Sequence, residues 1–138
     1  MERRSNFYIC GECGNFVKLL TASGKELSCC GKKMGNIEPY TDGTLAKKHL
    51  PIVEAKKGRV TVKVGEIMHP SEENHAIAWI HLITRFGSQY KYLLPGEEPT
   101  AEFSLTDGDI PIAAYAYCST HGLWKTQINK GDEGKDFK

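Results

Sequence analysis

Nine of the ten cysteine and histidine residues in this 138-residue chain fall into two groups with the spacing of metal ligands. The first group crowds the N-terminal part as the pair Cys10-x-x-Cys13 and the adjacent pair Cys29-Cys30. The second group is spread over the rest of the chain and comprises His49, His69, His75, Cys118 and His121. Because thiolates and imidazoles bind iron, zinc and copper well, the sequence predicts two metal centres.

The four N-terminal cysteines predict a tetrathiolate site. Glycine follows each pair and gives the backbone room to turn around the sulfur atoms. Because successive side chains point in different directions, binding one ion through both Cys29 and Cys30 is expected to distort an ideal tetrahedron. Iron and zinc both suit four thiolates, and the ligand type alone does not separate them. A structural zinc knuckle and a disulfide between Cys29 and Cys30 are the alternatives that remain open.

The second group predicts a metal with an open coordination position. Four imidazoles and one thiolate are too many ligands for a tetrahedral zinc site, but they suit iron with a sixth position free. Each ligand has a proline, a glycine or another turn signal nearby and is expected at or near a strand end or turn, where loop residues can converge on a rigid scaffold. The spacing Cys118-x-x-His121 is the strongest part of this signal. His81, the remaining histidine, is expected in mid-strand and is interpreted as a packed side chain.

Composition describes a folded chain with no broad affinity for nucleic acid. Hydrophobic residues make up 40% of the sequence, charged residues 25%, and the formal net charge is only +1. No stretch is long and apolar enough to cross a bilayer, and residues 1–8 lack the apolar core of a signal peptide. The cysteine spacing does not resemble a secreted disulfide scaffold. We therefore expect a cytoplasmic protein with no nucleic-acid or membrane partner.

The chain is expected to contain two units joined by a short connection. Residues 1–36 can bury little apolar surface, so a metal would have to supply the stability of this first unit. Residues 37–46 contain a proline and an Asp-Gly turn and are interpreted as a linker. Residues 47–128 form the second unit, and residues 129–138 form a charged tail.

Period-two alternation dominates the second unit. The segment from Arg59 to Val64, for example, places three valines on one face and polar residues on the other. Strands are expected at residues 51–56, 59–64, 77–83, 89–94, 100–105, 111–118 and 123–128. Glycine, proline and aspartate turn signals separate these strands, and no convincing long helix is present. This pattern predicts an all-β protein with an antiparallel sandwich.

These motifs together resemble those of desulfoferrodoxin, the two-iron class of superoxide reductases. Residues 7–15 and 29–34 are similar to the desulforedoxin-type module of that family. Residues 48–51, 69–79 and 117–124 are similar to its catalytic domain, so the resemblance covers about residues 6–126. It implies a small rubredoxin-like metal module followed by an immunoglobulin-like antiparallel sandwich.

The resemblance also implies two iron ions per chain. The first would be Fe(Cys)4, held by the four N-terminal cysteines. The second would be Fe(His)4(Cys), with Cys118 in the axial position and four histidines in the plane, namely His49, His69, His75 and His121. This iron, when ferrous, would reduce superoxide by one electron to hydrogen peroxide at its open sixth position. Rubredoxin or a similar small donor would re-reduce the protein, and members of the family are homodimers.

Two lysines precede the first histidine of the second group. Lys48 matches a family lysine that attracts superoxide and assists its protonation through water. Lys47 departs from the family pattern, in which a glutamate commonly caps the open position of the oxidised enzyme. Since a lysine cannot act as an anionic ligand, we expect water or hydroxide there, and stronger attraction of the anion by the two adjacent cations.

Three other functions are compatible with the ligand pattern. A pure electron carrier would cycle the four-cysteine iron and keep the second site structural, although five ligands with an open face argue against it. A binding module would hold zinc in the first site and recognise a partner through the sandwich. A peroxidase-like enzyme would activate bound peroxide instead of releasing it, which product analysis would reveal.

Overall fold

The computed structural model describes residues 6–65 and 75–129. The predicted ligand His69 and nearly all of the tail at 129–138 therefore lie outside the described residues. The chain divides into two compact units, Met1–Pro39 and Tyr40–Lys138. Strands make up almost all of the regular structure in both units, as predicted. Among the described residues, no helix has the length and apolar character needed to cross a bilayer.

The first unit contains two small antiparallel sheets. One has the strand order β2-β1-β5, with β1 at Phe7–Ile9, β2 at Phe16–Lys18 and β5 at Gly35–Asn36. The other is the hairpin of β3 (Ser28–Cys29) and β4 (Lys32–Lys33). Among the described residues of this unit, the buried apolar side chains are those of Phe7, Cys10 and Met34. A core this small provides little stability without a metal or a cross-link.

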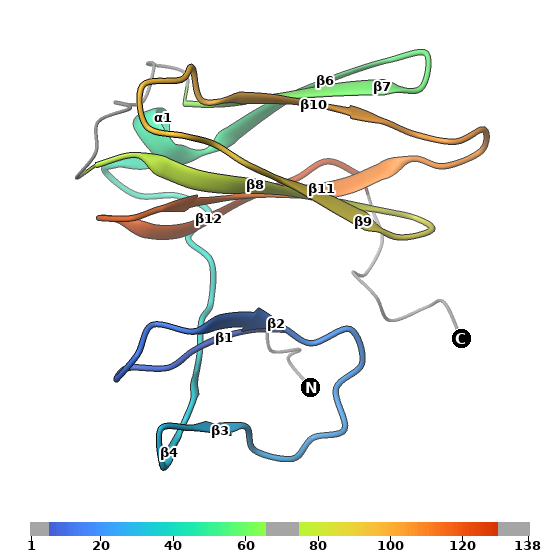
Figure 1. Ribbon diagram of the computed structural model, residues 1–138. Coiled ribbons are helices and arrows are strands. Elements are labelled where there is room, and N and C mark those ends of the chain that lie inside the picture. Colours follow the sequence, from blue (N-terminus) through green and yellow to red (C-terminus); the bar gives the residue numbers. More distant parts are fainter. Residues whose placement is uncertain (1–5, 66–74, 130–138) are drawn as a thin grey trace. The chain divides into compact units, whose positions relative to one another are not determined.

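The second unit is a seven-stranded antiparallel sandwich, as the alternation predicts. One sheet has the order β10-β7-β6, with β6 at Pro51–Lys56, β7 at Arg59–Val64 and β10 at Thr100–Ser104. The other has the order β12-β11-β8-β9, with β8 at Ile77–Thr84, β9 at Ser88–Tyr92, β11 at Pro111–Cys118 and β12 at Gly122–Gln127. Figure 1 shows the three-stranded sheet lying over the four-stranded sheet. All seven predicted strands are present, with ends that differ by two residues at most.

The core of the sandwich lies between the two sheets and includes one predicted ligand. Val60, Val62 and Val64 alternate inward from β7 and are almost completely buried. They belong to the same core as alanines of β11 and as Cys118, which is 0% exposed. Full burial of a valine stabilises a fold by about 1.5–3 kcal/mol. Packing of the core therefore holds Cys118 on a rigid strand.

The second unit also contains a one-turn helix, α1 (Ala46–His49), which the sequence pattern did not predict. The helix ends because Leu50 is extended (φ −70°, ψ 131°), the conformation that Pro51 imposes on the residue before it. His49 ends this helix just before β6 begins at Pro51, so the expectation that it lies near a strand end is confirmed. A single turn has too few residues to show helical periodicity, so local sequence pattern cannot reveal it.

His81 is packed in mid-strand, as predicted. Its side chain is 8% exposed on β8, and its ring centroid lies 6.2 Å from that of Tyr90 and 6.3 Å from that of Tyr115. This histidine is thus accounted for by packing against aromatic neighbours.

The start of β12 requires a glycine. Gly122 has φ +88°, and a Cβ atom added there would lie 3.4 Å from Cε2 of Tyr40. We expect Gly122→Ala to lower the free energy of unfolding by about 1–2 kcal/mol, the cost of a left-handed conformation for an L-residue. Urea unfolding of the metal-loaded proteins would measure this difference.

The matched control is Gly87→Ala, where an added Cβ meets nothing within 4 Å and φ is not in the left-handed region. We therefore expect the free energy of unfolding to change by less than about 0.5 kcal/mol in this variant. Equal stability of the two variants would contradict the prediction.

Candidate metal centres

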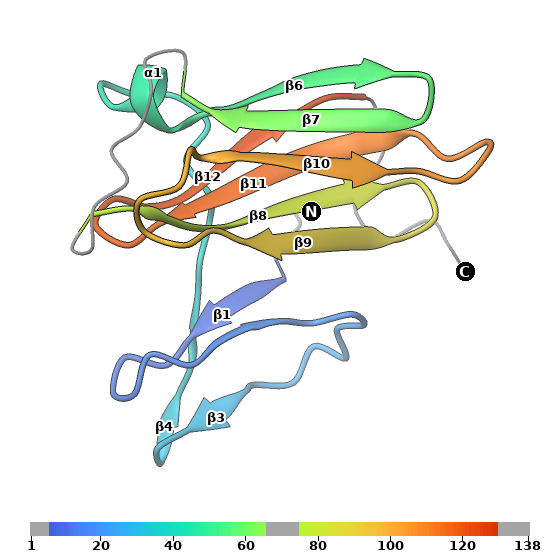
Figure 2. The same cartoon turned by 45° about the horizontal axis from the view of Figure 1, so that its top comes forward.

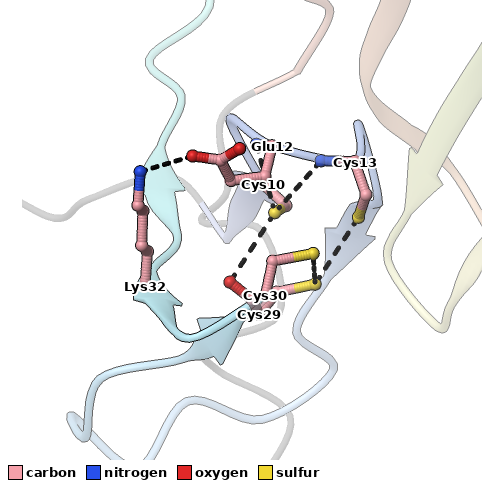
Figure 3. A network of polar contacts seen from close by, with 6 residues as sticks. All are labelled: Cys10, Glu12, Cys13, Cys29, Cys30 and Lys32. Carbon is pink, nitrogen blue, oxygen red and sulfur yellow. Dashed lines mark hydrogen bonds and ion pairs between the residues drawn. The ribbon is translucent and has the colours of Figure 1, made fainter.

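The four N-terminal cysteines converge into one site, which we call the tetrathiolate site. Their sulfur atoms all lie within 4.8 Å of one another and face a common centre (Figure 3). The Sγ atoms of Cys13 and Cys29 are 3.6 Å apart, and those of Cys29 and Cys30 are 4.0 Å apart. A tetrahedral ion with metal–sulfur bonds of about 2.3 Å places its sulfurs about 3.8 Å apart. The site therefore fits a metal ion with little rearrangement.

Backbone amides favour the thiolate form of Cys10. The Cys10 N–H donates to the carbonyl of Asn15, and Gly14 N–H donates to the carbonyl of Cys10, each at 2.9 Å. This tight turn directs the amides of Cys13 and Glu12 at the Cys10 sulfur, at 3.5 and 3.4 Å. Hydrogen bonds from these two amides lower the pKa of Cys10 to about 6. The Cys-x-x-Cys segment thus prepares one anionic ligand before any metal arrives.

A hairpin turn explains how adjacent cysteines can share one ion. Cys30 and Gly31 connect β3 to β4 with φ values of +54° and +72°, the positive values that a type I′ turn requires at both central residues. The left-handed conformation of Cys30 brings its sulfur to the same side as that of Cys29. All five cysteines are free, and a separation of 4.0 Å is far beyond a disulfide bond of about 2.05 Å. The disulfide alternative is therefore rejected.

The raised pKa values of two cysteines indicate that the tetrathiolate site needs a bound cation. Hydrogen bonds shared with Cys13, Cys10 and Cys29 raise the pKa of Cys30 to about 12. The pKa of Cys29 is also raised, chiefly by its hydrogen bond with Cys13. Four thiolates at this separation repel one another, so all four deprotonate together only around a bound cation. Beside them, exposed Lys32 and Glu12 form an ion pair (Figure 3).

The second group of ligands gathers at one end of the sandwich, and we call it the histidine–cysteine site. His49 ends α1, His75 lies just before β8, Cys118 ends β11, and His121 lies in the turn between β11 and β12. Figures 1 and 2 show α1, the start of β8 and this turn at the same end of the sandwich. The ligand atoms of these four residues lie within 4.8 Å of one another.

The distances within the histidine–cysteine site match a shared ion. Nδ1 of His121 lies 3.2 Å from Nε2 of His49 and 3.8 Å from Sγ of Cys118. Bonds of about 2.0–2.3 Å from one metal place neighbouring ligand atoms about 3 Å apart and opposite ones above 4 Å. Nδ1 of His49 lies 2.8 Å from the carbonyl of Leu45, to which it donates, so Nε2 remains for the metal. His49 would thus bind through Nε2 and His121 through Nδ1.

Burial keeps His49 in the form that binds metals. The side chain is 1% exposed, and this burial lowers its pKa despite the hydrogen bond to Leu45, which raises it. The nearby imidazoles of His121 and His75 lower the pKa further. A neutral imidazole carries the lone pair that a metal needs.

Two supporting residues received no role from the sequence. One is Leu45, whose backbone carbonyl orients His49. The other is Trp124, whose ring is stacked on that of His49 at 5.0 Å between centroids. Trp124 follows His121 by three residues, and this proximity was the only available signal. A backbone carbonyl carries no sequence signal at all.

A small β unit with four thiolates and a β-sandwich with a histidine–cysteine group together define a two-centre metalloprotein. The family model described as desulfoferrodoxin matches residues 41–127 of the chain. The chain is also 39% identical over 127 residues to the desulfoferrodoxin of Syntrophotalea carbinolica, covering 92% of this chain and 99% of that protein. The desulfoferrodoxin of Nitratidesulfovibrio vulgaris is 38% identical over the same shares of each chain. This chain belongs to the desulfoferrodoxin family.

A solved structure extends the similarity to three dimensions. The superoxide reductase from Treponema pallidum matches with a TM-score of 0.75 at 32% identity, covering 92% of this chain and 100% of that one. The predicted family and the predicted all-β fold are confirmed. The tetrathiolate site and the histidine–cysteine site are the metal-binding groups that fit the two iron sites of desulfoferrodoxin.

Proposed function

We propose that this protein is a superoxide reductase, which reduces superoxide by one electron to hydrogen peroxide. The observation that carries the proposal is the convergence of three histidines and the buried Cys118 at one end of a rigid sandwich. Solved and curated relatives support it, among them the Treponema pallidum structure and the superoxide reductase of Pyrococcus horikoshii, which is 34% identical over 99 residues. The balanced reaction adds one electron and two protons to superoxide.

The residues of the histidine–cysteine site would bind the metal ion, and one of them would also change its electron density. Iron suits this donor set, and when bound it supplies the electron that superoxide accepts. We assign His49, His75, His121 and Cys118 as its ligands, together with His69. The thiolate of Cys118 would raise electron density at the metal, the effect that an axial thiolate has in haem enzymes. The buried core around Cys118 would keep this thiolate in place.

Lys48 would attract the anionic substrate. It is an exposed cation on α1 directly before His49, and Lys47 adds a second exposed cation. We expect Lys48→Ala to lower the second-order rate constant for superoxide by about tenfold at low ionic strength, and Lys47→Ala to lower it less. Salt should reduce the wild-type rate more than that of the Lys48 variant, because it screens the attraction.

The matched control for this prediction is Lys56→Ala. Lys56 is an exposed lysine at the turn between β6 and β7, which lies at the opposite end of the sandwich from α1 (Figures 1 and 2). Its removal lowers the net charge equally but should leave the rate nearly unchanged. If the Lys48 and Lys56 variants lose the same share of the rate constant, only the net charge of the protein determines the attraction of superoxide.

Rapid mixing of the anaerobically reduced protein with superoxide tests the proposed function. Fast oxidation of iron that yields hydrogen peroxide and no dioxygen is expected. An absence of reaction with both irons bound would favour the electron-carrier alternative. Formation of an oxidised co-substrate at the expense of peroxide would favour the peroxidase alternative.

The proposal includes a rubredoxin-like electron donor, a homodimer and a cytoplasmic location. The exposed thiols of Cys13 and Cys30 support contact between a small donor and the tetrathiolate site. Five free cysteines support a compartment that keeps thiols reduced. The tetrathiolate iron would either relay electrons from the donor or stabilise the first unit.

A further inference from the structure

Trp124 contacts two of the assigned ligands at once. Its indole ring lies parallel to the imidazole of His49, with 5.0 Å between ring centroids and 21° between ring planes. Its Nε1–H donates to the backbone carbonyl of His121 at 3.2 Å. The side chain is only 3% exposed. One buried residue thus touches the ring of one ligand and the backbone of another.

Tyr40 also contacts Trp124 and its neighbours, through both its ring and its backbone. The ring centroids of Tyr40 and Trp124 are 5.0 Å apart, so two contacts join the rings of Tyr40, Trp124 and His49 in a chain. The backbone of Tyr40 bonds to both neighbours of Trp124, accepting from Lys125 N–H at 2.9 Å and donating to the carbonyl of Leu123 at 2.8 Å. These contacts leave the indole little freedom to rotate.

The two ligands need this support for different reasons. The hydrogen bond from His49 to Leu45 fixes one point of the imidazole, and a flat neighbour is needed to fix the plane of its ring. His121 lies in the turn between β11 and β12, outside the strand pairing that holds Cys118. The bond from the indole to the His121 carbonyl ties this turn to β12.

We propose that Trp124 is a positioning residue of the histidine–cysteine site. It sets the ring plane of His49 and the backbone of His121, so that Nε2 of the first and Nδ1 of the second face one metal ion. The role rests on the proposed function only in assuming that iron is bound at this site. Partners of metal ligands typically change metal affinity or activity by 10–100-fold when they are removed.

Trp124→Phe separates the two contacts, because phenylalanine can still stack on His49 but cannot donate to His121. Trp124→Ala removes both contacts. The matched control is Trp79→Phe at the other tryptophan of the chain, whose ring centroid lies 5.6 Å from that of Tyr117 and 6.4 Å from that of His81.

The measurements are the release of iron to a chelator, the electron paramagnetic resonance spectrum and the midpoint potential, all on the iron-loaded protein. The tetrathiolate iron serves as an internal standard in every sample. We expect the second iron to leave about tenfold faster in Trp124→Phe and about 100-fold faster in Trp124→Ala, with an altered spectrum and potential. Trp79→Phe should stay within about twofold of wild type, because the ring of Trp79 packs on Tyr117 and near His81.

If Trp124→Phe releases iron at the wild-type rate and its spectrum is unchanged, the proposal is overturned, even if Trp124→Ala does not fold. If Trp79→Phe releases iron as fast as Trp124→Phe, the proposal is also overturned, because the effect would then be general destabilisation. None of these measurements uses superoxide. If Trp124→Phe loses iron as expected but the wild-type protein does not reduce superoxide, the positioning role is supported and the proposed function fails.

Discussion

Replacing Cys118 by serine is expected to lower the rate of the proposed superoxide reduction by at least about 100-fold while the sandwich stays folded. Serine has nearly the size of cysteine, so the core around this 0% exposed residue keeps its packing. Its hydroxyl does not ionise at neutral pH and cannot replace a thiolate ligand. Because loss of an indirect partner already costs 10–100-fold, loss of the thiolate itself should cost at least about 100-fold in rate.

Rapid mixing with superoxide would measure the loss, and absorption spectroscopy would follow the thiolate–iron band of the second iron. The matched control is Ala116→Ser, which adds a buried hydroxyl two residues earlier on β11 in the same core. An unpaired buried hydroxyl costs about 1–3 kcal/mol of stability, so this control should be less stable but still active. A Cys118→Ser variant that reacts at the wild-type rate would remove Cys118 from the proposed ligands.

Replacing Cys13 by serine is expected to unfold the first unit locally while the sandwich remains intact. The described core of that unit has only three buried apolar side chains, whereas a metal bound by four ligands can supply on the order of 10 kcal/mol of folding free energy. Amide hydrogens of β1, β2 and β5 should therefore exchange at least about 100-fold faster, which corresponds to losing a small part of that energy. Amides of β7 and β11 should keep their protection.

Hydrogen exchange followed by mass spectrometry would resolve the two units in one experiment. Lys33→Ala is a suitable control, since it breaks the exposed ion pair with Glu26 at 3.3 Å, which is worth about 0–1 kcal/mol. A chelator that strips iron from the wild-type protein should reproduce the effect of Cys13→Ser. Unchanged protection of β1 and β2 in that variant would show that the apolar core holds the unit without a metal.

The features that could be predicted from the sequence are those that depend on residues close together in the chain. Alternation of valines and polar residues predicts β7 because a strand exposes its two faces in turn, and the other sandwich strands follow from the same local rule. The pairs Cys10-x-x-Cys13 and Cys118-x-x-His121 were visible because a single tight turn brings both members together. Fold class and the presence of two ligand groups were therefore predictable.

Contacts between residues far apart in the chain could not be predicted, because they depend on how the strands pair and pack. His49 and His121 are 72 residues apart in sequence, and they meet because α1 and the turn between β11 and β12 lie at one end of the sandwich. Cys29 and Cys30 can face one ion because the backbone of Cys30 is left-handed. This conformation is uncommon for residues other than glycine, so it could not be predicted from the residue type. His49 is also held by the backbone carbonyl of Leu45, which no side-chain pattern marks, and by a ring contact between α1 and Trp124 on β12. The ring contact depends on how distant segments pack in the whole unit, so no local pattern encodes it.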